Sequence, residues 1–319
     1  MTGAKGLDVT QILAIVLPVF GLIAVGLLAV KLHLITAETA DGVGQFSFVL
    51  AMPAYLFRTL ATSTLPATIP WGYWASYFGA IGLSWALTQF LGRRFLAMAR
   101  SEAVLAGLAA AMGNTVMIGI PLLVKAYGEQ VGVPIALILG LNLPLSMIVA
   151  TLMVEQAASG PQGQMGRRLM RGLATHPLFL AIIAGVLFSI SGIKLGGPPD
   201  QLLLALGVTG VPCALISLGG SLARYGIAGR IDRGLFISAM KLVAAPALVY
   251  VLGAHVFHLP PVYLATAVVF ASAPVGVNVY LFALRHQTGI AMISQAIALS
   301  SLLAVVSTSV WLWFLGIDG

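Results

Sequence analysis

Apolar stretches of membrane-crossing length follow one another along almost the entire chain, with only short polar breaks between them. About 20 apolar residues cross a bilayer as a helix, because backbone groups in hydrocarbon must be bonded within their own segment. Only 8% of the residues are charged, against about 25% in a soluble protein. The sequence therefore predicts an all-α polytopic membrane protein with ten transmembrane helices. Charges and turn residues place them near residues 9–30, 41–60, 70–92, 102–124, 131–155, 174–193, 201–223, 234–256, 261–284 and 290–315.

The basic residues are divided unequally between the two sides of this predicted membrane. Eleven fall on one side: Lys31, Arg93, Arg94, Arg100, Arg167, Arg168, Arg171, Arg224, Arg230, Arg233 and Arg285. Four fall on the other side: Lys5, Arg58, Lys125 and Lys194. Lysine and arginine accumulate on the cytoplasmic side of membrane proteins. We therefore expect both termini to lie outside and the central connector to be cytoplasmic, in a bacterial inner membrane.

The central connector divides the predicted helices into two sets of five. We expect a first five-helix repeat at 1–155, a cytoplasmic connector at 156–173 and a second five-helix repeat at 174–319. Because five is odd, the second repeat enters the membrane with the opposite orientation, which makes an inverted repeat. The second and seventh stretches support this pairing, since each carries one internal proline, Pro53 and Pro212.

The fourth and ninth stretches are interrupted by glycine, proline and asparagine. The fourth contains Gly113, Asn114, Thr115, Gly119 and Pro121 within nine residues. Proline removes a backbone donor and glycine loosens the helix, so such a break is tolerated in a membrane only where protein or water takes over the freed groups. The ninth carries a comparable run from Ala273 to Asn278. Paired interruptions in two halves indicate the binding site of a secondary transporter.

The fourth stretch resembles a specific family of carriers. It reads Asn114-Thr115-Val116-Met117-Ile118-Gly119-Ile120-Pro121-Leu122-Leu123 and is followed by Lys125-Ala126-Tyr127-Gly128. This is similar to the auxin efflux carrier family, which includes the plant PIN carriers and bacterial members that are malonate-transporter-like. The ninth stretch, Pro274-Val275-Gly276 continuing to Phe282-Ala283, resembles the second crossover helix of that family. Plant carriers have proline at the place aligned with Val279, and Asn278 is more similar to the bacterial branch.

The resemblance implies a fold like that of sodium/proton antiporters and bile-acid transporters. Spans 4 and 9 would be broken near the membrane centre and cross, with substrate bound beside the crossing. Spans 1, 2, 6 and 7 would form a scaffold, through which a homodimer is implied, and spans 3–5 and 8–10 a moving transport core. In the second half, either Pro274 or the backbone from Gly276 to Asn278 would make the crossing.

The chemistry at the crossing favours an anion over a cation. All nine acidic residues lie at or near the predicted span ends, whereas carriers of sodium or protons place a buried acid pair at the crossing. Amide side chains and positive helix N-termini suit a carboxylate instead. We predict transport of a small organic anion by alternating access, and keep a sodium- or proton-coupled cation antiporter of the same fold as the alternative. The predicted substrate-binding residues are Gly113, Asn114, Thr115, Gly276, Val277 and Asn278, and the predicted helix-crossing residues are Gly119, Pro121 and Pro274.

The sequence is compatible with more than one role for two basic residues. Lys241 lies well inside the eighth stretch, where it could attract an anion, balance charge, titrate in a proton-coupled cycle, or extend to the cytoplasmic interface. Arg58, at the outer end of the second stretch, could guide anions or anchor the helix at the interface.

Other classes of function lack their sequence signals. The chain has neither a metalloprotease HExxH motif nor a phosphate-binding P-loop, so we expect neither an enzyme nor an ATP-driven pump. Its single cysteine gives neither a disulfide framework nor a Cys-rich metal site, and no metal or cofactor is predicted. Because the basic residues sit in loops between apolar spans, the expected partners are the lipid bilayer and a small anion, not nucleic acid.

Overall fold

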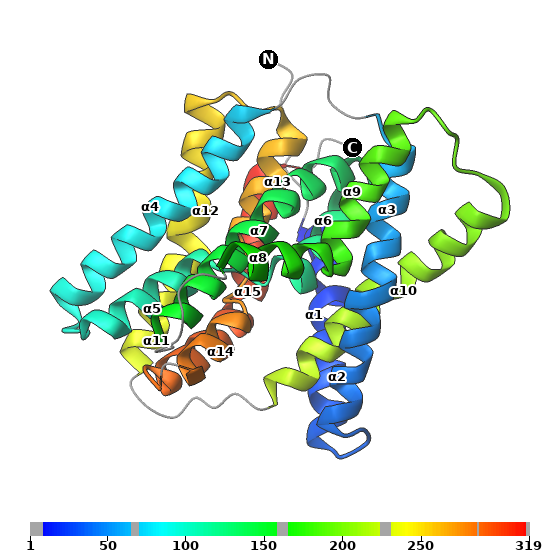
Figure 1. Cartoon of the computed structure of the whole chain (residues 1–319). Coiled ribbons are helices and arrows are strands. Elements are labelled where there is room, and N and C mark those ends of the chain that lie inside the picture. Colours follow the sequence, from blue (N-terminus) through cyan, green and yellow to red (C-terminus); the bar gives the residue numbers. More distant parts are fainter. Residues whose placement is uncertain (1–8, 65–69, 158–164, 224–230, 286, 317–319) are drawn as a thin grey trace.

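The computed structural model describes residues 9–64, 70–157, 165–223, 231–285 and 287–316, and within these ranges the chain is helical without a β-strand (Figure 1). The first half contains α1 (Val9–Lys31), α2 (Ala37–Phe46), η1 (Ser47–Ala51), α3 (Met52–Thr62), α4 (Trp71–Phe95), α5 (Arg100–Ala111), η2 (Thr115–Gly119), α6 (Ile120–Tyr127), η3 (Gly128–Val131) and α7 (Gly132–Ala157). The second half contains α8 (Met165–Ala174), α9 (Pro177–Ile190), α10 (Gly197–Leu222), α11 (Ile231–Ala239), η4 (Met240–Ala244), α12 (Ala245–Val251), η5 (Leu252–Val256), α13 (Pro261–Ser272), α14 (Asn278–Arg285) and α15 (Ile290–Leu315).

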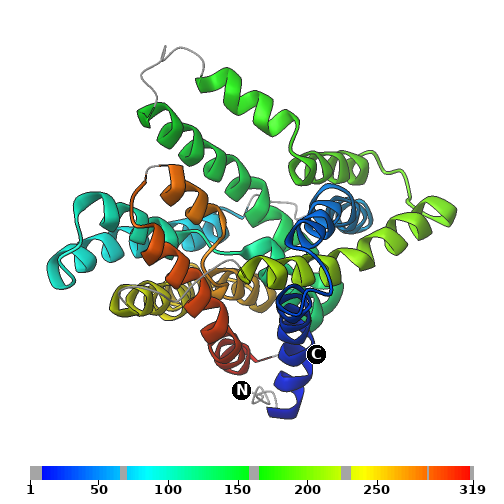
Figure 2. The ribbon, with the colours of Figure 1, turned by 90° about the horizontal axis from the view of Figure 1, so that it is seen from below.

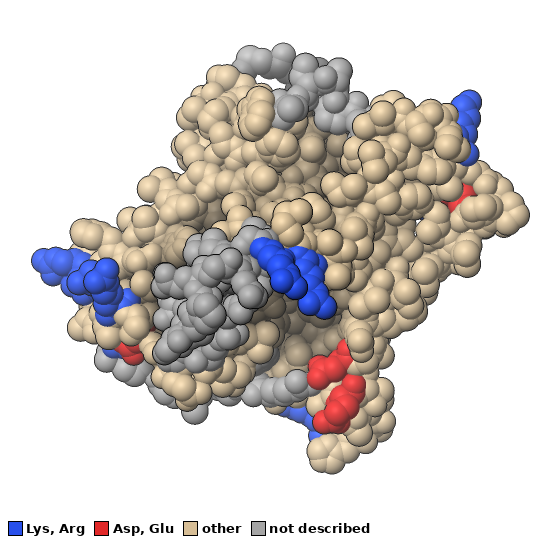
Figure 3. All heavy atoms as spheres, in the orientation of Figure 1, with Lys and Arg blue, Asp and Glu red and all other residues tan. Residues whose placement is uncertain are grey.

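Several of these helical stretches are long and apolar enough to cross a membrane. Five meet both conditions among the described residues: Thr10–Lys31, Thr115–Ser146, Gly197–Leu222, Ile231–Val256 and Ile290–Leu315. Outward-facing side chains agree with a lipid environment, since Leu17, Leu187, Leu202 and Val306 are each 59–68% exposed. Figure 3 shows a face that is uncharged over most of its described area, with charged side chains in a few separate places. The chain is therefore a polytopic membrane protein, while the count of ten crossings stays a prediction.

Three prolines in the helical stretches follow wide helical turns. Pro53, Pro121 and Pro246 each stand one residue into an α-helix, directly after the π-helical segments η1, η2 and η4. Proline cannot donate to the carbonyl four residues earlier and its ring crowds that carbonyl. A π-helical turn changes the local bonding register at such a point. The chain therefore passes each of these prolines without leaving the helix.

The predicted connector contains a helix that composition did not indicate. Residues 158–164 lie outside the described ranges, but α8 follows them and carries Arg167 and Arg171. It packs against α7 and α9. The basic residues of the connector are thus presented from a helix and not from a loop.

The helices gather into two groups, seen on the right and left of Figure 1 and again from below in Figure 2. In one group α10 packs against α1, α2 and α3, and α3 also packs against α9. Glycines allow this: a Cβ at Gly26 would overlap the backbone of Ile216, and one at Gly219 would overlap that of Ile23. Small residues permit such close helix contact in membranes, where lipid is as apolar as leucine.

The second group surrounds the broken helices. Here α4 packs against α5 and α12, α11 against α15, and α13 against α12 and α15. The two groups meet where α1 contacts α6 and α15, where α3 contacts α7, and where α10 contacts η2. The segment after the first break therefore touches helices of both groups.

Candidate functional site

Both predicted interruptions are real breaks in the helices. The first lies between α5, which ends at Ala111, and η2, which begins at Thr115. The second lies between α13, which ends at Ser272, and α14, which begins at Asn278. Each break leaves backbone N–H and C=O groups without their partners four residues away.

The two breaks meet and bond to each other through their backbones. Gly113 and Val275 form an isolated antiparallel bridge. The N–H of Asn114 donates to the carbonyl of Pro274 at 2.8 Å, and the N–H of Gly276 donates to the carbonyl of Met112 at 2.9 Å. Both sequence alternatives for the second half therefore take part, Pro274 through its carbonyl and Gly276 through its amide.

Glycine is required at this contact because the two backbones come so close. A Cβ on Gly276 would lie 3.2 Å from the Met112 carbonyl oxygen and 3.3 Å from that of Gly113. Both distances are tighter than ordinary contacts, and the atoms that would have to move are backbone atoms. An alanine at 276 would therefore push the two broken segments apart.

The other predicted residues surround this contact at different depths. Asn114 is half-buried, and its amide nitrogen approaches the sulfur of Met117 at 3.7 Å. Thr115 is buried and Val277 half-buried, whereas Asn278 is exposed at the start of α14. The asparagines are thus unequal, with Asn114 beside the crossing and Asn278 turned outward.

Gly119 and Pro121 lie further along the first broken segment. A Cβ on Gly119 would lie 2.7 Å from the ring of Phe270 on α13, so this glycine lets the two crossing segments pack closely. Pro121 is buried in the first turn of α6. Neither belongs to the backbone bridge itself.

Ser300 is a residue of the crossing that the sequence did not single out. In a continuous helix the N–H of Val275 would donate to the carbonyl of Ala271. It donates instead to the hydroxyl oxygen of Ser300 on α15, at 3.0 Å, in a buried position. The signal was present, since Ser300 and Ser301 stand side by side between the apolar residues 296–299 and 302–306.

Lys241 also lies at the crossing of the two broken segments. Its side chain is fully buried, and its ammonium nitrogen donates to the carbonyl oxygen of Ala271 at 2.8 Å. A Cβ on Gly113 would lie 2.8 Å from this nitrogen. The lysine therefore points into the crossing and does not extend to the cytoplasmic interface.

Two arginines form ion pairs near helix ends. Arg58 on α3 binds Asp200 on α10, with Nε–Oδ1 at 2.7 Å, and also approaches Glu129 of η3 at 3.4 Å. Arg233 on α11 binds Glu102 on α5 at 2.8 Å. Arg58 thus connects three elements instead of standing free for an anion. Within the described ranges, no three His, Cys, Asp or Glu residues are grouped to hold a metal.

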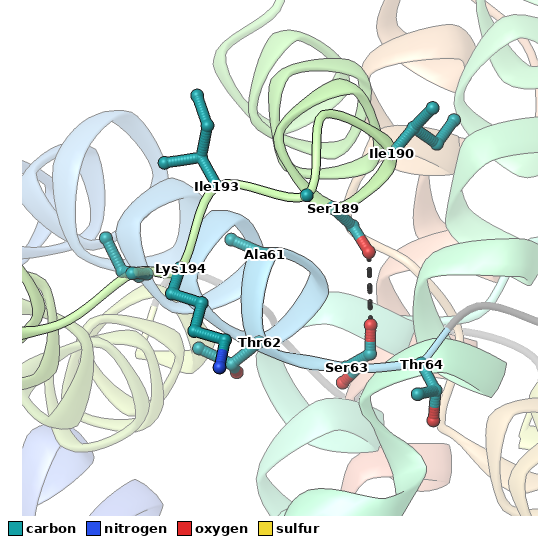
Figure 4. Close-up of a pocket in the computed structure, with 10 residues that line it drawn as sticks. Ala61, Thr62, Ser63, Thr64, Ser189, Ile190, Ile193 and Lys194 are labelled. Carbon is teal, nitrogen blue, oxygen red and sulfur yellow. Dashed lines mark hydrogen bonds between the residues drawn. The ribbon is translucent and has the colours of Figure 1, made fainter.

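A cavity of about 590 Å³ lies elsewhere, at the ends of α3 and α9 (Figure 4). It is bordered by residues 61–64 and by residues 189–195 apart from Ser191, and the hydroxyl of Ser189 donates to the carbonyl of Ser63 at its edge. None of the predicted site residues lines it. The crossing is therefore the better candidate, since it joins broken backbone, a buried cation and an amide.

Comparison with known proteins agrees with this geometry. Residues 11–312 match the family described as "Membrane transport protein". The chain belongs to this family, the auxin efflux carrier family. The predicted resemblance is confirmed over nearly the whole chain, and the protein is a transporter and not an enzyme.

Relatives of this carrier occur in bacteria and archaea. It is 28% identical over 302 residues to a protein of Rhizobium meliloti named "Putative malonate transporter", with 94% of both chains covered. It is 23% identical over 316 residues to an "Uncharacterized transporter" of Methanothermobacter thermautotrophicus, covering 93% of this chain and 96% of that one. The similarity therefore extends over all the helices around the crossing.

Proposed function

We propose that this carrier moves a small organic anion, a carboxylate such as a dicarboxylate or an auxin-like acid, across the membrane by alternating access. The observation that carries the proposal is the crossing itself, where two broken segments bond backbone to backbone beside a buried ammonium. The name of the Rhizobium meliloti relative supports a dicarboxylate.

The segments that leave the crossing give it a positive character. The helical run of η2 and α6 begins at Thr115, and α14 begins at Asn278. Helix N-termini carry free N–H groups and a partial positive charge, which favour a carboxylate. The half-buried amide of Asn114 stands beside the first of them and can donate to a carboxylate oxygen. We infer a substrate site formed by Gly113, Asn114, Thr115, Gly276, Val277 and Asn278.

The motion we propose follows from the two groups of helices. The helical stretches at the ten predicted positions would cross the membrane as an inverted repeat of five and five. The group containing α1, α2, α3, α9 and α10 would act as the scaffold, and the broken segments with α4, α7, α11, α12 and α15 as the moving core. Termini outside, a cytoplasmic connector and a homodimer through the scaffold stay predictions.

Uptake of labelled malonate into proteoliposomes tests the function. We expect saturable uptake by the unaltered protein and a loss of about tenfold or more with Asn114→Ala, since a desolvated charged hydrogen bond is worth about 1.5–3 kcal/mol. Asn142→Ala on α7 is the matched control, because it removes another asparagine within a predicted span that takes no part in the backbone bonds of the crossing. Undiminished uptake by folded Asn114→Ala would contradict the site. Sodium or proton exchange without malonate uptake would favour the cation antiporter.

A further inference from the structure

Lys241 is the one charged side chain in the buried set of described residues. It stands in η4, midway along the helical run from Ile231 to Val256. Burying an ammonium away from water is costly, and such residues inside membrane segments commonly serve the transport pathway. Its environment therefore needs a physical explanation.

The end of α13 provides one side of the environment of Lys241. Ala271 lies in the last turn of α13, where carbonyls have no partner within the helix and the helix dipole is negative. The N–H of Val275, which would have bonded this carbonyl, is taken by Ser300. The ammonium of Lys241 donates to the carbonyl in its place at 2.8 Å.

Gly113 bounds the other side. A Cβ there would lie 2.8 Å from Nζ of Lys241 and 2.9 Å from Cε, so the absence of a side chain leaves room for the ammonium. Gly113 is half-buried and adjoins Asn114. Little more than one glycine backbone therefore separates the positive charge from the predicted substrate site.

The positive charge of Lys241 faces the negative end of the α13 helix dipole, and no described carboxylate is buried beside it. Among the described side chains, no aspartate or glutamate is buried, and Glu102, Glu129 and Asp200 pair with arginines near helix ends. A carbonyl orients an ammonium without neutralising it. A carboxylate arriving beside Gly113 would supply the missing negative charge at short range, where the low dielectric strengthens the attraction.

We propose that Lys241 determines the specificity of the site for anions, placing its ammonium group behind Gly113 so that the crossing prefers a carboxylate to an uncharged molecule of the same size. This inference rests on the proposed function. It differs from a purely structural role, in which Lys241 only caps the end of α13. A structural cap would affect stability and leave the preference for charge unchanged.

Binding of malonate and of its uncharged diamide, malonamide, to the purified protein separates these roles. Titration calorimetry on the unaltered protein should show tighter binding of malonate. Lys241→Met keeps most of the side-chain length and removes the charge, so malonate affinity should fall about tenfold or more while malonamide affinity changes little. Lys241→Arg should retain the preference for malonate. Lys194→Met, which removes one positive charge at an exposed loop, is the matched control and should bind like the unaltered protein.

The outcomes distinguish the two proposals. Unaltered protein that binds neither compound overturns the proposed substrate class. Unaltered protein that binds malonate, together with a folded Lys241→Met that binds it equally well, overturns only the role of Lys241. If Lys241→Met does not fold, Lys241→Gln serves instead, because its uncharged amide can still donate to the carbonyl of Ala271. A selective loss of malonate binding in that variant supports the proposal, and an equal loss of both compounds overturns it.

Discussion

Gly113→Ala tests whether the glycine of the first break exists to accommodate Lys241. Gly113 does not have a positive φ, so alanine is tolerated by the backbone and the effect is one of contact. The new methyl would lie 2.8 Å from the ammonium nitrogen, whereas ordinary contact begins at 3.4 Å. The ammonium would therefore have to retreat by about 0.6 Å, the difference between these distances. A shift of that size changes the length or angle of its 2.8 Å bond to Ala271 and so weakens it.

The expected magnitude follows from the bond that is lost. A hydrogen bond to a charged group contributes about 1.5–3 kcal/mol, and a buried group left unbonded costs a similar amount. Replacing glycine by alanine at a compatible site otherwise stabilises by about 0.4–1 kcal/mol, through the unfolded state. Gly113→Ala should therefore lower the free energy of unfolding by roughly 1–3 kcal/mol in the unaltered protein.

The same substitution should be nearly harmless once the lysine is shortened. The leucine side chain in Lys241→Leu lacks the two lysine atoms that the methyl would meet, Cε and Nζ. In that background Gly113→Ala should be neutral or slightly stabilising. The difference between the two backgrounds is a coupling energy of about 1.5–3 kcal/mol, which a double-mutant cycle measures directly. The assay is denaturant unfolding in detergent, followed by the fluorescence of the five tryptophans.

An effect of Gly113→Ala that is equal in both backgrounds would refute this reasoning. It would mean that the methyl strains the backbone contact with α13, where the carbonyl oxygen of Ala273 lies 3.3 Å from the new Cβ, and not the lysine. Gly82→Ala in α4 is the matched control, since a Cβ there would meet no atom within 4 Å.

Three further substitutions test individual contacts of the structure by unfolding in detergent. Ser300→Ala leaves the N–H of Val275 buried without its partner and should cost about 1–3 kcal/mol, while the neighbouring Ser301→Ala should cost less. Gly132→Ala brings a methyl against Cγ2 of Thr59, so it should destabilise the contact of α3 with α7, and adding Thr59→Ser should restore stability because serine lacks that methyl. Arg58→Met should lower stability by about 1 kcal/mol at low salt and by less at high salt, because its partly exposed ion pairs are screened.

The positions of the breaks could be predicted from the sequence, because particular residue types mark them. Gly113 marks the first, and Pro274 and Gly276 mark the second, whereas Pro121 lies in the helix that follows the first break. Each residue acts on its own backbone, by removing a donor or a Cβ, so its effect is local. Helices with these interruptions are therefore found where the composition predicts them, at residues 112–114 and 273–277.

The partners of the broken backbone could not be predicted in the same way. The bond from Asn114 to the carbonyl of Pro274 uses a backbone group that any residue possesses, so no residue type indicates it. Lys241 illustrates the same limit for a side chain, since its long flexible stem can lead either to the interface or inward. The free carbonyl of Ala271 fixes its direction, and that carbonyl becomes available only after α13 ends.

These bonds together define which parts of the crossing remain for a substrate. Asn114 and Pro274, Gly276 and Met112, Val275 and Ser300, and Lys241 and Ala271 satisfy one another in four pairs. Groups that are already paired gain little from a new hydrogen bond to a ligand, because binding would exchange one bond for another, whereas the positive charge of Lys241 still attracts an anion beside Gly113. The groups left to donate to the proposed carboxylate therefore include those that the pairs do not use, the first N–H groups after Asn114 and its side-chain amide. The paired groups instead join η2, α13, η4 and α15, so that the segments around the crossing are bonded to one another directly.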